Sequence, residues 1–106
     1  MEAGAFPSDQ YAAATQCQHH GLDPDSTVIT VAPREGERLL RTDDIVSGIR
    51  AVGDELALVL FSGVHYGTGQ VFDMATIATA AQAAGAICGL DLAHAMGKTH
   101  HWCISD

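Results

Sequence analysis

The stretch ELALVLF, residues 55–61, decides the fold of this chain, together with the run AICGLD at residues 86–91. Both runs are short and almost continuously apolar, which is the pattern of a strand buried on both faces of a parallel sheet. A third run, TVITVA at residues 27–32, is rich in β-branched residues and predicts another buried strand. The sequence therefore predicts three strands.

Helical patterns alternate with these strands. The predicted helices are YAAATQCQHH ending at Gly21, DDIVSGIRAVG, and MATIATAAQAAG ending at Gly85. The residues expected to cap them are Ser8 or Asp9, Thr42 or Asp43, and Asp73. Because each crossover fits a right-handed βαβ unit, we expect an α/β fold with a parallel sheet and helices on both faces, in three α/β/α layers.

Composition limits the possible classes of function. The chain has 106 residues, so it is one small domain or part of a larger one. Its formal net charge of -8 makes it a poor electrostatic match for nucleic acid or an anionic membrane. Its three cysteines form no CxxC pair, which indicates reduced thiols and an intracellular setting. No apolar run reaches membrane-spanning length, and the first ten residues lack the pattern of a signal peptide. We draw no domain boundary within residues 1–106.

A candidate site lies where the predicted strands end. Ligands of parallel α/β sheets bind beyond the carboxyl ends of strands, where Ser62 and Asp91 are expected. A carboxylate after an apolar run needs a partner. Asp91 has three possible roles: pairing with a protein cation, capping the turn begun by LAHAM, or facing a ligand nitrogen. Pyridoxal phosphate is a cofactor whose ring nitrogen an aspartate keeps protonated.

Three neighbouring features each have two interpretations. His94, three residues after Asp91, is either a core histidine or a second contact to the same ligand. FPSD, residues 6–9, has two interpretations. It is either a helix start, or it supplies an aromatic ring that stacks on a ligand ring, with Asp9 near the same pocket. LFSGV lacks the first glycine of a GxSxG elbow, so Ser62 is predicted to donate or accept hydrogen bonds rather than to act as a nucleophile.

His100, His101 and Cys103 do not predict a metal site. Adjacent histidines do not share a helix face, and no second cluster supplies the remaining ligands that zinc requires. We therefore expect no metal cofactor.

Four motifs, in their order and spacing, resemble the kynureninases. The resemblance runs from Ala5 to Gly97 and identifies the chain as a central fragment of the large domain of a pyridoxal-phosphate enzyme with the aspartate-aminotransferase fold. The motifs are FPSDQYA (6–12), PREGE (33–37), LFSGVHYGTGQ (60–70) and GLDLAHAMG (89–97).

The resemblance implies a set of residues that bind pyridoxal 5'-phosphate. Phe6 corresponds to the aromatic residue that stacks on the pyridine ring, and Asp91 to the aspartate that pairs with the pyridinium nitrogen. The whole implied set is Phe6, Pro7, Ser8, Asp9, Ser62, Asp91 and His94.

The implied reaction is hydrolysis of kynurenine or 3-hydroxykynurenine to anthranilate or 3-hydroxyanthranilate plus alanine. It belongs to cytoplasmic tryptophan catabolism, which leads in some organisms to NAD biosynthesis. The resemblance also implies a homodimeric parent protein and a small-molecule substrate, with no nucleic-acid or membrane partner.

The sequence departs from the family pattern near its end. Its one lysine, Lys98, lacks the Ser-Tyr-Lys motif that carries the family's Schiff-base lysine, so we assign no catalytic residue. The tail from residue 98 to 106 no longer follows the pattern, and Gly67 stands where an aromatic residue is common. We therefore expect that the chain alone does not turn over kynurenine. The alternatives are a non-catalytic folded or interaction module and, less favoured by the motif around Asp91, another pyridoxal-phosphate enzyme such as a cysteine desulfurase-like protein.

Overall fold

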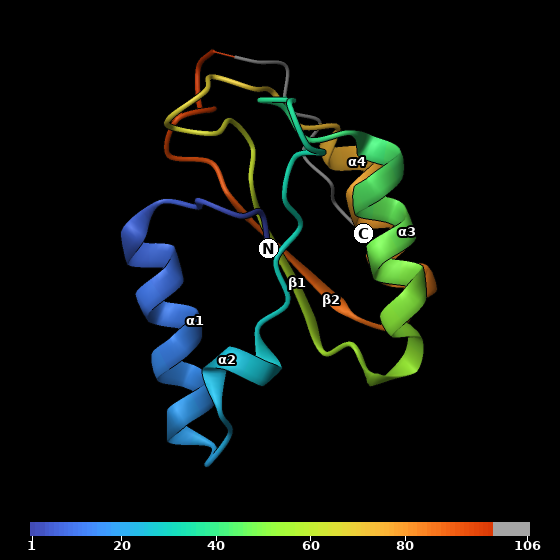
Figure 1. Ribbon diagram of the computed structural model, residues 1–106. Coiled ribbons are helices and arrows are strands. Elements are labelled where there is room, and N and C mark those ends of the chain that lie inside the picture. Colours follow the sequence, from blue (N-terminus) through green and yellow to red (C-terminus); the bar gives the residue numbers. More distant parts are fainter. Residues whose placement is uncertain (99–106) are drawn as a thin grey trace.

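Two parallel strands form the centre of the structure, a computed structural model that describes residues 1–98 (Figure 1). Strand β1 (Leu58–Ser62) pairs with β2 (Ile87–Asp91) in a register that sets Leu58 opposite Ile87 and Ser62 opposite Asp91. The prediction of an α/β fold with a parallel sheet is confirmed. Both strands lie where the apolar runs predicted them, although β1 begins three residues later because residues 53–55 form a 3-10 turn.

One face of the sheet carries the hydrophobic core. Side chains alternate along a strand, so Val59 and Phe61 of β1 point to the same face as Cys88 and Leu90 of β2. Helices α3 (Thr42–Val52) and α4 (Met74–Ala83) cover this face. The buried residues of this cluster are Leu40, Ile45, Ile49, Val59, Phe61, Phe72, Ile77, Ala81 and Ala86.

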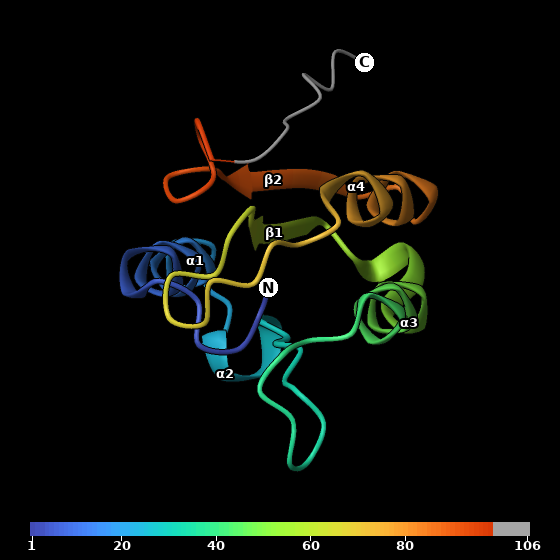
Figure 2. The same ribbon diagram turned by 90° about the horizontal axis from the view of Figure 1, so that it is seen from above.

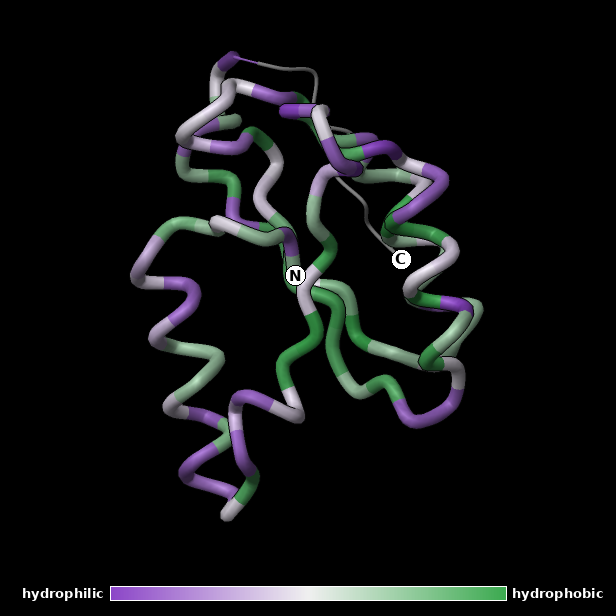
Figure 3. The backbone as a smooth tube through the Cα atoms, viewed as in Figure 1, coloured by the Kyte–Doolittle hydropathy of each residue, from purple (hydrophilic) through white to green (hydrophobic). Residues whose placement is uncertain are grey.

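The other face is less completely covered. Helix α1 (Pro7–His19) and the short helix α2 (Pro24–Thr27) lie on the opposite side of the sheet from α3 and α4, so helices flank both sides (Figure 2). Helix α1 has no buried residue. Leu58 and Ile87 remain 52% and 73% exposed. Hydrophobic residues accordingly concentrate along the strands and the helices beside them, whereas the turn after α1 is hydrophilic (Figure 3).

The predicted strand at residues 27–32 is wrong. Only Val31 forms a bridge, in which its N–H donates to the Met1 carbonyl over 3.0 Å and its carbonyl accepts from the Ala3 N–H over 2.8 Å. The run loses only its first residue, because Thr27 completes α2. The remaining residues 28–32 are as long as β1, but Pro33 follows them with no N–H to donate, and their only bridge within the described residues is that between Val31 and Glu2.

The predicted cap of α4 is confirmed, and that of α3 is wrong. One carboxylate oxygen of Asp73 accepts from the Thr76 N–H over 3.1 Å, and the other accepts from the Thr76 hydroxyl over 2.7 Å. Helix α3 has Arg41 at its N-cap position, and no side chain caps it. Thr42 and Asp43 lie inside its first turn, where the negative charge of Asp43 is favourable for the helix dipole.

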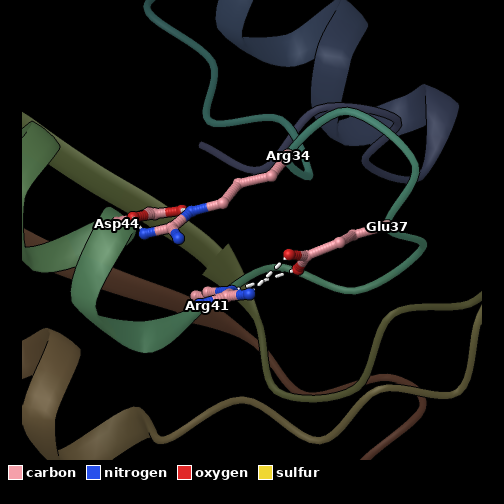
Figure 4. Close-up of polar contacts among 4 residues, drawn as sticks. All are labelled: Arg34, Glu37, Arg41 and Asp44. Atoms are coloured by element: carbon pink, nitrogen blue, oxygen red, sulfur yellow. Dashed lines mark hydrogen bonds and ion pairs between the residues drawn. The ribbon is translucent and has the colours of Figure 1, made fainter.

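Two bidentate ion pairs hold the connection before α3 (Figure 4). Arg34 donates to Asp44 over 2.8 and 2.9 Å, and Arg41 donates to Glu37 over 2.6 and 3.1 Å. The hydrogen bond from Arg34 lowers the pKa of Asp44, and that from Arg41 lowers the pKa of Glu37. Because these pairs are exposed, they contribute little to the free energy of folding. Their main effect is to fix the path of the chain before α3.

Candidate functional site

Three elements meet at one edge of the sheet. Strands β1 and β2 end together at Ser62 and Asp91, because the two residues are paired in register. On a parallel sheet, paired residues point to the same face, here the face of α1. Residues 63–72 form the loop that leaves β1, and the chain after β2 turns back at residues 92–96.

Helix α1 begins beside this edge. Its N-cap is Phe6, and Pro7 occupies the first helical position, where its missing N–H costs nothing. Ser8 and Asp9 therefore lie in the first turn, so the prediction that one of them caps the helix is wrong. The interpretation of FPSD as a helix start is confirmed. The same helix start places Phe6 and Asp9 beside the ends of the strands.

Aromatic rings from three segments gather next to the carboxyl ends of the strands. The Phe6 ring lies 5.0 Å from that of Tyr66, edge to face, and 6.1 Å from the His94 ring. Tyr66 in turn lies 6.4 Å from His94 and stacks on His65 at 5.4 Å. His94 is exposed, so it is not a core histidine. No sequence pattern indicated a role for Tyr66, although an aromatic residue is common one position later, where this chain has Gly67.

Asp9 and Asp91 interact across the gap between α1 and β2. Desolvation, a hydrogen bond with Asp91 and then the charges of Asp91 and Glu2 raise the pKa of Asp9 to about 6. The hydrogen bond from the Ala93 N–H, followed by that from Asp9, lowers the pKa of Asp91. These opposite shifts mean that, as pH falls, the pair takes up its first proton on Asp9, at about pH 6.

Asp91 also caps the turn that follows it. Its Oδ1 accepts from the Ala93 N–H over 2.9 Å, and the Leu92 carbonyl accepts from the N–H groups of Ala95 and Met96 over 3.0 and 2.9 Å. The interpretation of Asp91 as a cap is therefore confirmed. Within residues 1–98, Asp91 forms no ion pair with a protein cation.

Ser62 lies at the same edge and is hydrogen-bonded to Glu2, a residue that no sequence pattern indicated. Its hydroxyl donates to Glu2 Oε1 over 2.5 Å, and its N–H faces Oε1 and Oε2 at 3.2 and 3.4 Å. Glu2 is 2% exposed and Ser62 is 8% exposed. The sequence around Glu2 has no apolar periodicity, so no pattern signals that this glutamate is buried.

Gly63 fixes the distance between the two strand ends. A Cβ on this residue would lie 2.8 Å from the Ala95 Cβ, 3.0 Å from Leu92 Cδ2 and 3.2 Å from Met74 Sδ. Its N–H donates to the Asp91 carbonyl over 2.8 Å. The absence of a side chain therefore lets the turn that carries His94 pack directly on the end of β1.

The described residues contain neither a metal site nor a membrane span. Within residues 1–98, no group of three or more His, Cys, Asp or Glu residues could hold a metal ion, and no helix is long and apolar enough to cross a membrane. The histidines and cysteine considered for zinc, His100, His101 and Cys103, lie outside the described residues. Lys98 is exposed at the end of the turn after β2.

The geometry suits a flat, cationic ring. Phe6, Tyr66 and His94 offer π faces and edges, and Asp9 and Asp91 offer carboxyl oxygens beside them. Carboxylates favour a protonated nitrogen, while ring contacts favour a planar apolar body.

Comparison with known proteins identifies relatives along nearly the whole chain. Kynureninase of Nematostella vectensis is 58% identical over 96% of this chain, that of Flavobacterium psychrophilum 53% over 95%, and that of Mus musculus 48% over 96%. The resemblance inferred from the four motifs is confirmed. The chain spans about a quarter of the length of these curated relatives, 23%, 25% and 23% respectively. No protein-family profile matches the chain.

Proposed function

Because this chain is homologous to a segment of the kynureninases, we propose that it forms part of a pyridoxal-phosphate site of the kynureninase type. The reaction served is hydrolysis of kynurenine or 3-hydroxykynurenine to anthranilate or 3-hydroxyanthranilate plus alanine, in cytoplasmic tryptophan catabolism. The parent protein is proposed to be a homodimer. One observation supports the proposal most directly: Phe6, Asp9, Asp91 and His94 come together from α1 and the end of β2.

The residues present fit the ring end of the cofactor. Pyridoxal phosphate supplies an electron sink whose strength depends on a protonated ring nitrogen. Asp91 would accept a hydrogen bond from that protonated nitrogen, since the hydrogen bond from the Ala93 N–H lowers the pKa of its carboxyl group and favours the ionised form. Phe6 and His94 would contact the cofactor's ring.

Asp9 prepares the site for a cation. Below its pKa of about 6, the proton of Asp9 relieves the repulsion between two neighbouring carboxyl groups. A protonated ring nitrogen would take the place of that proton, so in this pH range ligand binding is expected to release it from Asp9. Pro7 and Ser8 contribute to the start of the helix that sets Phe6 and Asp9 in place, and Ser62 contacts the cofactor from the end of β1.

We propose that residues 1–106 form a single cofactor-binding unit that is not catalytically competent by itself. Lys98, the one lysine of the sequence, lies on an exposed turn and has no Ser-Tyr-Lys context. This observation also favours the second candidate, a non-catalytic module derived from a pyridoxal-phosphate enzyme.

Titration of the purified chain with pyridoxal phosphate tests the proposal. We expect saturable binding with a change in the cofactor's absorption spectrum, and no release of fluorescent anthranilate from kynurenine. Asp91→Asn should weaken binding about tenfold or more, because it removes a charged hydrogen bond to the ring nitrogen. The exposed Asp54→Asn is the matched control and should bind normally. Equal binding by both variants contradicts the assigned role of Asp91.

A further inference from the structure

A buried glutamate at the start of the chain is bonded to the serine at the end of β1. Within residues 1–98, the hydrogen bonds that the Glu2 carboxyl group accepts come from Ser62: one from the hydroxyl at 2.5 Å and one from the N–H, shared between its two oxygens. Backbone bonds between Ala3 and Val31 and between Val31 and Met1 keep the segment around Glu2 in place. The contact therefore joins two segments that lie 60 residues apart in sequence.

Within residues 1–98, no salt bridge compensates Glu2, although its charge opposes the lowering of the pKa of the Met1 amino group by burial. Within the described residues, Glu2 is the one charged side chain that is buried, and it takes part in no ion pair. The nearby amino group of Met1 donates instead to the Ile29 carbonyl over 3.1 Å. A buried carboxyl group is costly unless its hydrogen bonds are made, so the pair with Ser62 is what makes this burial tolerable.

We infer that Glu2 is a positioning residue that fixes the direction of the Ser62 hydroxyl proton. A serine hydroxyl has one proton to donate and two lone pairs to accept with. Since the Ser62 hydroxyl donates its hydrogen bond to Glu2, only its lone pairs are left to interact with a ligand bound beyond β1. A ligand group that contacts Ser62 Oγ must therefore be a hydrogen-bond donor, such as a hydroxyl or a protonated nitrogen, and not a bare phosphate oxygen. This inference rests on the proposed function for the identity of the ligand.

The orientation of Ser62 can be tested without any cofactor. NMR couplings between the Ser62 Hβ protons and its hydroxyl proton, which exchanges slowly when buried, report the rotamer of the O–H bond. We expect one fixed rotamer in the unmodified chain and in Glu2→Gln, whose amide oxygen still accepts, and averaged couplings in Glu2→Leu. Averaged couplings in the unmodified chain overturn the inference, as does a fixed rotamer in Glu2→Leu. If Glu2→Leu does not fold, the unmodified chain decides the result.

A pyridoxal-phosphate titration then separates positioning from simple stabilisation. Glu2→Leu should raise the dissociation constant about tenfold, whereas Glu2→Gln, which removes the charge but keeps an acceptor, should change it less than about threefold. In a Ser62→Ala background, Glu2→Leu should have no further effect, because Glu2 acts through Ser62. Additive effects contradict the inference. If the unmodified chain binds no cofactor, the proposed function fails, while the couplings still decide how Ser62 is oriented.

Discussion

Asp9 and Asp91 belong to different elements, and the proton between them makes stability depend on pH. The pKa of Asp9 in the folded chain, about 6, lies above its ordinary value of 3.8. Between these values the folded chain binds more protons than the unfolded chain, so the contribution of Asp9 to stability falls as pH rises. The pKa of Asp91 is lowered, so its contribution is present above pH 3.8 and is lost as pH falls through its folded pKa.

Asp9→Asn should therefore stabilise the chain at neutral pH. The amide still donates to Asp91 but carries no charge, so the repulsion between the carboxylates is removed. We expect a gain of about 0.5–1 kcal/mol at pH 7.5 and none at pH 4, where Asp9 is already protonated. Urea denaturation at the two pH values measures this difference. A gain of equal size at both pH values, or a similar gain in Asp54→Asn, would show that the pair with Asp91 is not its source.

Gly63 should be intolerant of any side chain. Gly63→Ala places a Cβ against Ala95, Leu92 and Met74, and the Cβ of Ala95 has no flexible end to move away. The overpacking should cost about 1–3 kcal/mol in thermal or urea unfolding. Gly48→Ala in α3 is the matched control: its nearest contact is Val31 at 3.7 Å, and helix propensity should make it neutral or stabilising. Similar losses in both variants would contradict this account.

At the scale of elements, the longer helices α1, α3 and α4 differ in their capping, and only α4 among these three has a side-chain cap. Asp73 accepts two hydrogen bonds from Thr76, whereas no side chain caps α1 or α3. Asp73→Ala should reduce the free energy of unfolding by about 1 kcal/mol. The matched control, Asp43→Ala in the first turn of α3, removes only a favourable charge and should cost less, about 0.3–0.5 kcal/mol. Equal losses would show that the charge, and not the cap, matters.

Local patterns predicted the elements whose determinants are local. Two apolar runs were sufficient to predict β1 and β2, and an aspartate was sufficient to predict the start of α4, because burial and capping patterns extend over only a few residues. The run 27–32 is rich in β-branched residues, but a ladder also needs a partner strand, and within the described residues this run has only the bridge between Val31 and Glu2. The start of α1 was misplaced because Pro7 favours the first helical position over the nearby capping residues.

At the scale of the whole molecule, the site could be predicted only in part. The motifs and the rule that ligands bind at strand ends placed Asp91 and His94 correctly at that edge, and the FPSD motif brought Phe6 to them. Nothing local indicated Glu2, because its burial results from a contact with Ser62, which is 60 residues away. Long-range pairs of this kind depend on how elements pack, which no short pattern contains.

Packing is unequal on the two faces of the sheet, and this difference should appear in hydrogen exchange. Helix α4 buries Ile77, Ala78 and Ala81, whereas α1 buries no residue. Amides of α1 should therefore exchange through local opening, at least about tenfold faster than those of α4, whose exchange requires opening of the core.

Ligand binding should reduce that difference, because the proposed site lies between α1 and the carboxyl ends of the strands. Phe6 and Asp9 belong to the start of α1, whereas Asp91 and His94 lie at and after the end of β2, so a ligand held between them ties α1 to the sheet. Added pyridoxal phosphate should slow exchange in α1 and leave α3 nearly unchanged, as hydrogen-exchange mass spectrometry can measure. Uniform slowing of all helices would indicate general stabilisation. If exchange in α1 is as slow as in α4 before any ligand is added, α1 is held by contacts other than the site.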